Sequence, residues 1–374
     1  MNLVATFHKV ATKFTLRTKM GPMPFGRLAD PDCTVGTDPR ADPRMVKGLA
    51  AFGMDGRLPE PPLTLDSPLE QLVEFSNFAE QGTGAVLKML GEKAPAPEGV
   101  SSTTTTITGA DGNEITLYIS RPTEAAGPLP AVVHLHGGGM AILSAADIQY
   151  VRLRENLAAA GLVVIGVEFR NSGGALGPHP FPAGLGDCAA AVRWTAANKD
   201  QLGISHLIVS GESGGGNLTL TVALKANREG WGDEIAGVYA QCPYISNRWL
   251  EDADDLPSLR ENDGYFISCL QLALLGFLYD PNQEHAQDGT CWAGVATDAD
   301  LAGLPPHVIS VNELDPLRDE GLLYYRRLAG AGVSVVGRIV AGTCHAGDIL
   351  LAGAMPDVFA ATIRDIVGFA RSVS

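Results

Sequence analysis

Residues 206–217 read HLIVSGESGGGN, an apolar run that passes directly into a glycine-rich turn around a serine. The residues Gly211 to Gly215 fit the pattern G-x-S-x-G, and a helical pattern begins directly after them. On such a strand-to-helix turn, a serine hydroxyl lies at the carboxyl edge of a sheet, beside the positive end of the helix. A turn without chemistry and a phosphate-cradling loop are the alternatives, but the segment contains neither G-x-G-x-x-G nor Gly-Lys-Ser/Thr. The pattern therefore favours Ser213 as a nucleophile.

A second glycine-rich element, His136-Gly137-Gly138-Gly139, follows another apolar run, Ala131–Leu135. Three consecutive glycines can turn two backbone N–H groups toward one point, which is the arrangement that a developing oxyanion needs. The loss of one such donor typically costs about 3 to 4 kcal/mol of transition-state stabilisation. A flexible hinge is the alternative, but a hinge does not explain why both glycine-rich elements directly follow predicted strands. Together the two elements predict acyl-transfer chemistry.

A serine nucleophile needs a base, and the base needs a carboxylate that orients it. In this architecture the chain order is serine, acid, histidine. The chain has eight histidines, and only His345 follows a late strand pattern near the carboxyl terminus, in the segment GTCHAG. His345 is therefore the expected base.

The acid is expected on the loop that follows the apolar run His307–Val311. Asp315 is the preferred candidate because it lies on that loop and precedes a proline that fixes the turn. Glu313 is the rival. Asp319 and Glu320 are expected to cap or charge the first turn of the next helix.

Short apolar runs alternate with amphipathic stretches from about residue 101 onward. Buried runs of Val, Ile and Leu separated by helices require a mostly parallel sheet with helices on both faces. Two alternating segments flank Asp111-Gly112-Asn113, which predicts an antiparallel hairpin at the start of the sheet. The predicted class is α/β, with about eight strands. The expected strands are 103–108, 114–119, 131–135, 163–167, 207–209, 237–241, 308–311 and 333–340, and the expected helices are 150–160, 185–198, 215–228, 319–329 and 356–371.

The domain organisation is expected to be one catalytic domain, 101–374, with cap segments. Residues 1–100 hold 11 of the 24 prolines and read as an irregular helical cap, with short helical stretches at 69–78 and 84–90. Between residues 245 and 300 there is no strand pattern, which predicts an insertion that belongs to the cap. Leu3, Phe7, Val10 and Phe14 recur at helical spacing among basic residues. They predict an amphipathic helix packed on the protein, with a targeting peptide or a surface-binding helix as the alternatives.

Composition excludes several classes of partner. With 27 basic and 42 acidic residues the formal charge is −15, which repels nucleic acid and anionic lipid. No apolar run reaches membrane-spanning length. The six cysteines contain no C-x-x-C pair and mostly lie in apolar stretches, which predicts free buried thiols and a reducing, cytoplasmic location.

These motifs together resemble the hormone-sensitive-lipase-like branch of the α/β-hydrolases. The match includes HGGG at 136–139, GESGGGN at 211–217 and DPLRDEG at 315–321, and HPFPA at 179–183 strengthens it. Two features depart from the usual family pattern. Glu212 stands where the branch more often has Asp, and residues 169–178 replace a shorter motif.

The resemblance implies an α/β-hydrolase fold and a serine carboxylesterase. Ser213 would be the nucleophile, His345 the general base and Asp315 its orienting acid. The N–H groups of Gly137, Gly138 and Gly214 would form the oxyanion hole. The implied substrate is a small ester, short-chain or compact and possibly cyclic, and neither a metal nor an organic cofactor is expected.

Three alternatives stay open. An amidase or a lactonase would use the same triad, and a non-catalytic small-molecule receptor would share the fold. Such a receptor commonly lacks a triad member, whereas His345 is present. By the same resemblance, the apolar run 333–340 at the sheet edge makes a homodimer a further expectation.

Overall fold

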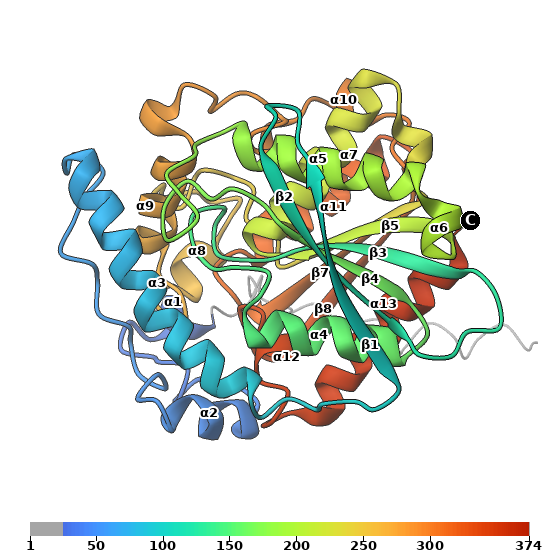
Figure 1. Ribbon diagram of the computed structural model, residues 1–374. Coiled ribbons are helices and arrows are strands. Elements are labelled where there is room, and N and C mark those ends of the chain that lie inside the picture. Colours follow the sequence, from blue (N-terminus) through green and yellow to red (C-terminus); the bar gives the residue numbers. More distant parts are fainter. Residues whose placement is uncertain (1–24, 374) are drawn as a thin grey trace, which may run out of the picture.

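Eight strands form one sheet in the order β1-β2-β4-β3-β5-β6-β7-β8, in the computed structural model, which describes residues 25–373 (Figure 1). Strand β2 runs antiparallel to β1 and β4, and all other neighbouring strands are parallel. The predicted sheet and its antiparallel hairpin are therefore confirmed. The amphipathic helix expected from Leu3 to Phe14 lies outside the described residues. The strands are β1 (Val100–Thr108), β2 (Glu114–Pro122), β3 (Leu129–Leu135), β4 (Val163–Glu168), β5 (Ile204–Glu212), β6 (Gly237–Gln241), β7 (His307–Leu314) and β8 (Val335–Cys344).

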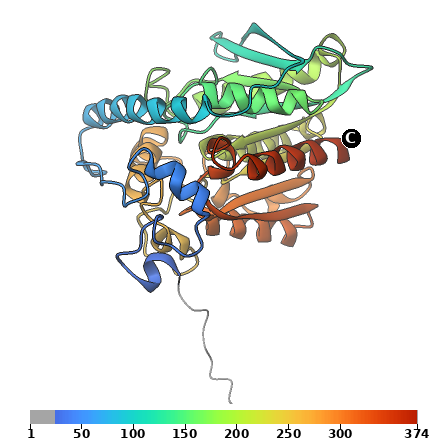
Figure 2. The ribbon, with the colours of Figure 1, turned by 90° about the horizontal axis from the view of Figure 1, so that it is seen from below.

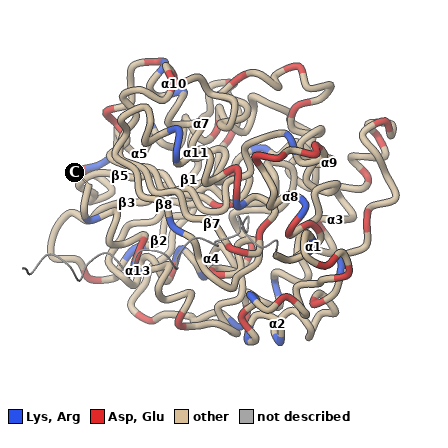
Figure 3. The backbone as a smooth tube through the Cα atoms, turned by 180° about the vertical axis from the view of Figure 1, so that it is seen from behind, with Lys and Arg blue, Asp and Glu red and all other residues tan. Residues whose placement is uncertain are grey.

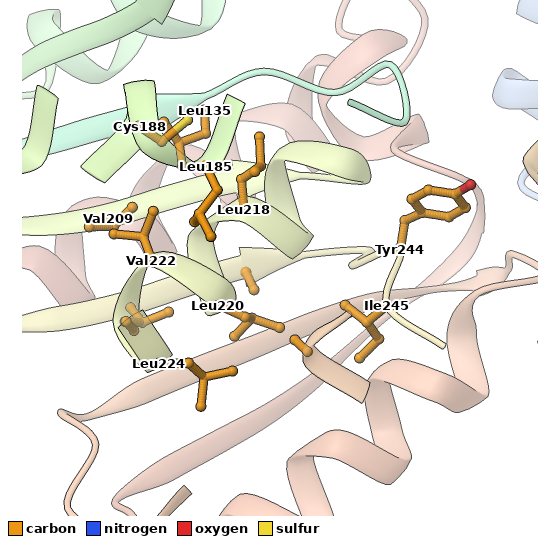
Figure 4. Packing of buried hydrophobic residues seen from close by; sticks show 14 of the residues in the cluster. Leu135, Leu185, Cys188, Val209, Leu218, Leu220, Val222, Leu224, Tyr244 and Ile245 are labelled. Carbon is orange, nitrogen blue, oxygen red and sulfur yellow. The ribbon is translucent and has the colours of Figure 1, made fainter. Parts of the chain in front are cut away.

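Alternate side chains of the central strands belong to two different hydrophobic cores. In β3, Val133 and Leu135 join one core and Val132 joins the other; in β5, Val209 and Ile208 divide in the same way. Because successive side chains of a strand point to opposite faces, each face needs its own layer of helices. Figure 4 shows part of the first core, where side chains of α5 and α7 meet those of β3 and β5. The first layer holds α5 (Ala183–Ala197), α7 (Gly214–Glu229) and α11 (Arg318–Gly330), and the second holds α4 (Ile148–Ala159) and α13 (Pro356–Ser372).

The remaining helices are mostly short, and several of them also contribute buried side chains to the two cores. They are α1 (Gly26–Ala29), α2 (Pro43–Ala50), α3 (Leu69–Gly91), α6 (Lys199–Leu202), α8 (Ser258–Glu261), α9 (Cys269–Tyr279), α10 (Asp298–Leu301) and α12 (Gly347–Leu350), with 3-10 turns at Gly232–Glu234, Pro281–Gln283 and Ala293–Val295.

Helix α3 differs from the prediction of two short stretches, because it is one continuous helix of 23 residues. Two glycines near the junction of the predicted stretches, Gly82 and Gly84, lie in open space, where a Cβ atom would meet nothing within 4 Å. A glycine inside a helix costs only about 1 kcal/mol. Burial of one leucine side chain contributes about 1.5 to 3 kcal/mol, so packing along α3 outweighs both glycines. The side chains that are buried along the helix are those of Leu72, Ser76, Ala79, Leu87 and Leu90.

Two segments far apart in the sequence lie side by side at one end of the sheet (Figures 1 and 2). Helix α3 packs on α9, and α1 packs on α8, so the N-terminal segment contacts the segment between β6 and β7. Polar contacts join them as well, since Arg40 forms ion pairs with Asp38 and Glu261, and the Tyr265 hydroxyl donates to Asp38 (3.2 Å). The division into cap segments (1–100 and 245–300) and a catalytic domain (101–374) stays a prediction.

The charged positions of the described chain are interspersed over helices and loops (Figure 3). Between residues 25 and 373, no helix is both long and apolar enough to cross a membrane. All six cysteines are free thiols, as predicted. Five of them are buried, and Cys33 is partly exposed.

A buried carboxylate, that of Glu320 in α11, anchors the chain where it leaves β6. It accepts hydrogen bonds from the backbone N–H groups of Ile245 (2.6 Å) and Ser246 (3.2 Å) and from the Trp249 indole (3.2 Å). The Ser246 hydroxyl also donates to it (2.5 Å). Glu320 lies in the first turn of α11, as predicted, and its carboxylate also binds a loop more than 70 residues away in sequence. Burial raises the pKa of this carboxyl to about 7, although the donors partly oppose that rise.

The Glu320→Gln variant is expected to lose a pH-dependent component of stability. The folded-state pKa of about 7 exceeds the ordinary value of 4.5, so the folded state binds more protons between these two values. The stabilisation is therefore complete below pH 4.5 and is lost as the pH rises through about 7, a change of about 3 kcal/mol at most. Between pH 5 and pH 8, the melting temperature should fall further for the wild type than for Glu320→Gln. Glu251→Gln, at an exposed carboxylate of the same loop, is the control, and equal pH dependence of the wild type and Glu320→Gln would contradict the expectation.

Candidate active site

Ser213 lies between the end of β5 and the start of α7, on the predicted strand-to-helix turn. Its backbone has φ 57° and ψ −121°, a region that residues with a Cβ atom rarely adopt. Two backbone hydrogen bonds fix the turn to β6 and to the loop that follows it. The Ser213 N–H donates to Gln241 O (3.0 Å), and the Ser213 carbonyl accepts from Tyr244 N (3.2 Å). At Gly215, a Cβ atom would collide with the carbonyl oxygens of Leu135 and His136. The glycines of the motif are thus required by the close approach of the β3 backbone.

The Glu212 carboxylate connects the two glycine-rich elements. It is 2% exposed, and it accepts hydrogen bonds from the Gly137 N–H (2.7 Å) and the His134 ring Nε2 (2.9 Å). Because Glu212 directly precedes Ser213, one residue positions both the nucleophile turn and the loop after β3. The sequence showed Glu212 only as a departure from the family pattern, and its contacts give it a positioning role.

The hydrogen bonds of the glycine loop, Gly137 to Gly139, differ from those of the predicted oxyanion hole at one residue. The Gly137 N–H already donates to Glu212, so it is not free to receive an oxyanion. Within residues 25–373, the N–H groups of Gly138, Gly139 and Gly214 have no hydrogen-bond acceptor. Gly139 lies against Gly214, where a Cβ atom would be 2.7 Å from the Gly139 nitrogen. Gly139 therefore replaces Gly137 as a candidate donor, beside Gly138 and Gly214.

His345 and Asp315 meet at the same edge of the sheet. The Nδ1 atom of His345, after β8, is 2.8 Å from Oδ2 of Asp315, after β7, and both side chains are buried. The other carboxylate oxygen of Asp315 accepts from Leu317 N (2.9 Å), which fixes its orientation. Burial alone would lower the pKa of His345, but Asp315 and Cys242 together outweigh it and raise that pKa well above the ordinary value. The pair is therefore suited to carry an imidazolium ion.

The rival carboxylates have other partners. Glu313 accepts from Gly342 N (2.8 Å), at the base of the loop that carries His345. Asp319 accepts from Ser258 N (2.7 Å) and pairs with Arg318. Asp315 is thus the carboxylate of this loop that reaches His345.

A buried amide that the sequence reasoning missed, that of Asn312 in β7, holds the loop around His345. Its nitrogen donates to Thr343 Oγ1 (2.7 Å) and to Asp348 Oδ1 (2.9 Å), and its oxygen accepts from Ala346 N (3.2 Å). These hydrogen bonds fix the chain on both sides of His345. A polar residue inside an apolar strand run was the available signal.

Cys242 is a second missed residue. It follows β6 directly and is 1% exposed, and its N–H donates to Ser310 O (2.7 Å). Its sulfur, a nitrogen of His345 and a carboxylate oxygen of Asp315 all lie within 4.8 Å of one another. In the described part of the chain, this is the one group of three such residues with a spacing that suits a metal ion. Burial raises the pKa of the Cys242 thiol.

Apolar side chains cover the glycine loop. A Cβ atom at Gly139 would lie 3.2 Å from Cδ1 of Leu275, in α9, and 3.8 Å from Cε1 of Tyr244. Ser213 itself is only 9% exposed. An open surface pocket of about 530 Å³ is lined by Trp194 and Lys199 beside the start of β5, at the opposite end of that strand from Ser213.

Comparison with known proteins agrees with this architecture. Residues 132–347 match a family model described as alpha/beta hydrolase fold. Two curated relatives come from Mycobacterium tuberculosis (strain ATCC 25618 / H37Rv). Esterase LipI is 33% identical over 64% of this chain and 71% of its own length, and carboxylesterase NlhH is 35% identical over 61% and 69%.

Two solved structures are also similar. One is brefeldin A esterase, described as a bacterial homologue of human hormone-sensitive lipase. It is 44% identical, covers 93% of this chain and 98% of its own, and has a TM-score of 0.89. The other is esterase Est22, at 38% identity, 90% and 99% coverage and a TM-score of 0.80. The resemblance to the hormone-sensitive-lipase-like branch is confirmed.

The backbone at Ser213 leads to a stability prediction. Ser213→Gly is expected to raise the free energy of unfolding by about 1 kcal/mol, because glycine adopts a positive φ without the strain of about 1 to 3 kcal/mol. The greater freedom of glycine in the unfolded chain offsets part of this gain. Ser213→Ala, the matched control, keeps the Cβ atom and should keep the strain. Urea unfolding of both variants measures the difference, and equal stabilities would contradict the expectation.

Proposed function

The chain belongs to the α/β-hydrolase fold family and is a carboxylic ester hydrolase, and we propose that it cleaves short-chain or compact esters through an acyl-enzyme on Ser213. One observation carries the proposal most directly, namely the 2.8 Å hydrogen bond between His345 and the buried Asp315. This pair follows β7 and β8, at the same sheet edge as the strained turn of Ser213.

In the first step, His345 accepts the proton of the Ser213 hydroxyl while the serine oxygen attacks the ester carbonyl carbon. The imidazolium that forms is stabilised by Asp315. The carbonyl oxygen gains negative charge and receives hydrogen bonds from the N–H groups of Gly138, Gly139 and Gly214. When the tetrahedral intermediate collapses, His345 gives its proton to the leaving alcohol, and the acyl group stays on Ser213.

In the second step, water takes the place of the alcohol. His345 accepts a proton from the water molecule, whose oxygen attacks the acyl carbon. The proton then returns to the Ser213 oxygen as the carboxylic acid leaves. The proposed reaction uses only groups of the chain and water.

The substrate preference is proposed from the cover over the glycine loop. Leu275 and Tyr244 pack on Gly139, so an acyl chain beside the oxyanion hole meets apolar side chains at van der Waals distance. This favours short acyl groups and compact, possibly cyclic, esters over long fatty acyl chains. A lactone and an anilide in the same substrate panel separate lactonase and amidase activities from simple ester hydrolysis.

A homodimer across β8 is a further proposal. Strand β8 is an edge strand, and its Val336 and Ile339 side chains are 56% and 55% exposed. Edge strands with exposed apolar side chains are suited to pairing across a two-fold axis.

Replacement of Ser213 tests the mechanism. Ser213→Ala is expected to lower kcat for p-nitrophenyl acetate by roughly a million-fold, as in other serine hydrolases that lose their nucleophile. An organophosphonate probe should add one phosphonyl group to the wild type, detected by intact mass, and none to the variant. Full activity of Ser213→Ala would disprove the acyl-enzyme, and an unlabelled, inactive wild type would instead favour a receptor.

Replacement of Leu275 tests the proposed acyl pocket. Leu275→Ala is expected to raise the ratio of kcat/KM for p-nitrophenyl octanoate to that for the acetate by about tenfold, since pocket contacts discriminate by about 1 to 3 kcal/mol. Leu278→Ala is the matched control, because this leucine of the same helix packs against Leu72 in a separate cluster. An unchanged ratio in Leu275→Ala, or an equal rise in the control, would contradict the assignment.

A further inference from the structure

We propose that Cys242, His345 and Asp315 form a binding site for one thiophilic divalent cation, such as Zn²⁺ or Cd²⁺, and that its occupancy blocks catalysis. The binding part of this proposal stands on the donor geometry. The inhibitory part rests on the proposed function.

The donor set is the first argument. A sulfur, an imidazole nitrogen and a carboxylate oxygen lie within 4.8 Å of one another. These are the ligand types of protein zinc sites. Zinc–ligand bonds of about 2.0 to 2.3 Å place the donors of a tetrahedral ion roughly 3.5 Å apart. A cation at His345 Nδ1 therefore needs side-chain shifts of about an ångström, because Nδ1 and Asp315 Oδ2, 2.8 Å apart, must separate and donors up to 4.8 Å apart must approach.

The three donors stand on a rigid support. They follow β6, β7 and β8, which are neighbours in the sheet. Cys242 is fixed by the hydrogen bond of its N–H to Ser310 O (2.7 Å) and has a positive φ of 34°. Asp315 is fixed by Leu317 N (2.9 Å). The backbone of Cys242 therefore holds the sulfur beside His345, and small side-chain motions can bring the donors together without moving that backbone.

Charge balance favours a divalent ion in this buried place. A thiolate and a carboxylate supply two negative charges, and a neutral imidazole supplies none, so one divalent cation leaves the group neutral. Binding releases to solvent the thiol proton and, where His345 is an imidazolium, one ring proton, because thiolate and neutral imidazole are the forms that bind a metal. Neutrality matters because an unbalanced charge is costly at positions where Cys242 and Asp315 are 1% and 0% exposed.

Occupancy removes the base from catalysis. Asp315 lies at Nδ1 of His345, so a cation shared by both residues binds Nδ1, displaces the Asp315 hydrogen bond and leaves the ring proton on Nε2. His345 then cannot accept the Ser213 proton, so inhibition should be complete and reversible by a chelator.

The test uses the full chain freed of metal by chelation, with Cd²⁺ as the probe. Cadmium bound to a thiolate has an ultraviolet charge-transfer band, which reports binding independently of activity. The wild type should bind one Cd²⁺ with this band and lose hydrolysis of p-nitrophenyl acetate in parallel, and EDTA should reverse both. In Cys242→Ser the band should vanish. The Cd²⁺ concentration that halves the activity of Cys242→Ser should be at least roughly 10- to 100-fold higher than that of the wild type. Even the loss of a residue that only hydrogen-bonds to a metal ligand weakens metal binding by that factor.

Cys33→Ser is the matched control, because Cys33 is the partly exposed thiol of the chain and lies outside the site. It should keep the band and the inhibition of the wild type. The proposal is overturned if the wild type has no band, if the band persists in Cys242→Ser, or if that variant is inhibited as strongly as the wild type. An inactive metal-free wild type would contradict the proposed function alone, since the band still tests the cation site.

Discussion

The site depends on backbone packing between two turns that have no space for side chains. The turn after β5 lies so close to the turn after β3 that a Cβ atom at Gly214 would be 2.6 Å from Met140 N. This contact brings the N–H groups of Gly139 and Gly214 close together at one edge of the sheet. Glu212 then fixes the spacing, because its buried carboxylate binds Gly137 N from the strand that ends at the nucleophile. The polar geometry of the site thus follows from a steric constraint on glycine.

Residue pattern and chain order were enough to predict the sheet and both helical layers. They also selected Ser213, Asp315 and His345, whose catalytic roles stay a proposal, although the structure does place His345 2.8 Å from Asp315. The residue pattern was enough because strands and glycine turns depend on neighbouring residues, and chain order is read directly from the sequence. The donor glycine was predicted wrongly, since Gly137, Gly138 and Gly139 have the same side chain. Only the position of the Glu212 carboxylate distinguishes their N–H groups. Helix α3 was divided wrongly because its continuity depends on packing with distant segments, which the local sequence does not show.

The contacts that sequence reasoning missed are long-range. Asn312 reaches residues 343–348, and Glu320 reaches residues 245–249, and neither contact follows from a local pattern. Asn312 lies on β7, Asp315 directly follows this strand, and Glu320 lies in α11, the next helix. The segment from β7 into α11 therefore carries the acid, supports the histidine loop and anchors the chain that leaves β6. These three roles explain why residues 312–320 include three buried polar side chains, those of Asn312, Asp315 and Glu320.

The ion pairs of Glu261 have a consequence for the exchange of segments between relatives. Glu261, in α8, binds both Arg40 of the N-terminal segment and Arg318, which is three residues after Asp315 (3.0 Å). Arg40 also donates to Asn262 (3.0 Å), whose amide nitrogen donates to the Asp315 carbonyl (3.1 Å). The N-terminal segment, the α8 segment and the acid loop therefore share one buried polar network, in which a single mismatched partner leaves a charge uncompensated. Segments borrowed from a homologue would have to be transplanted together, as one inherited unit.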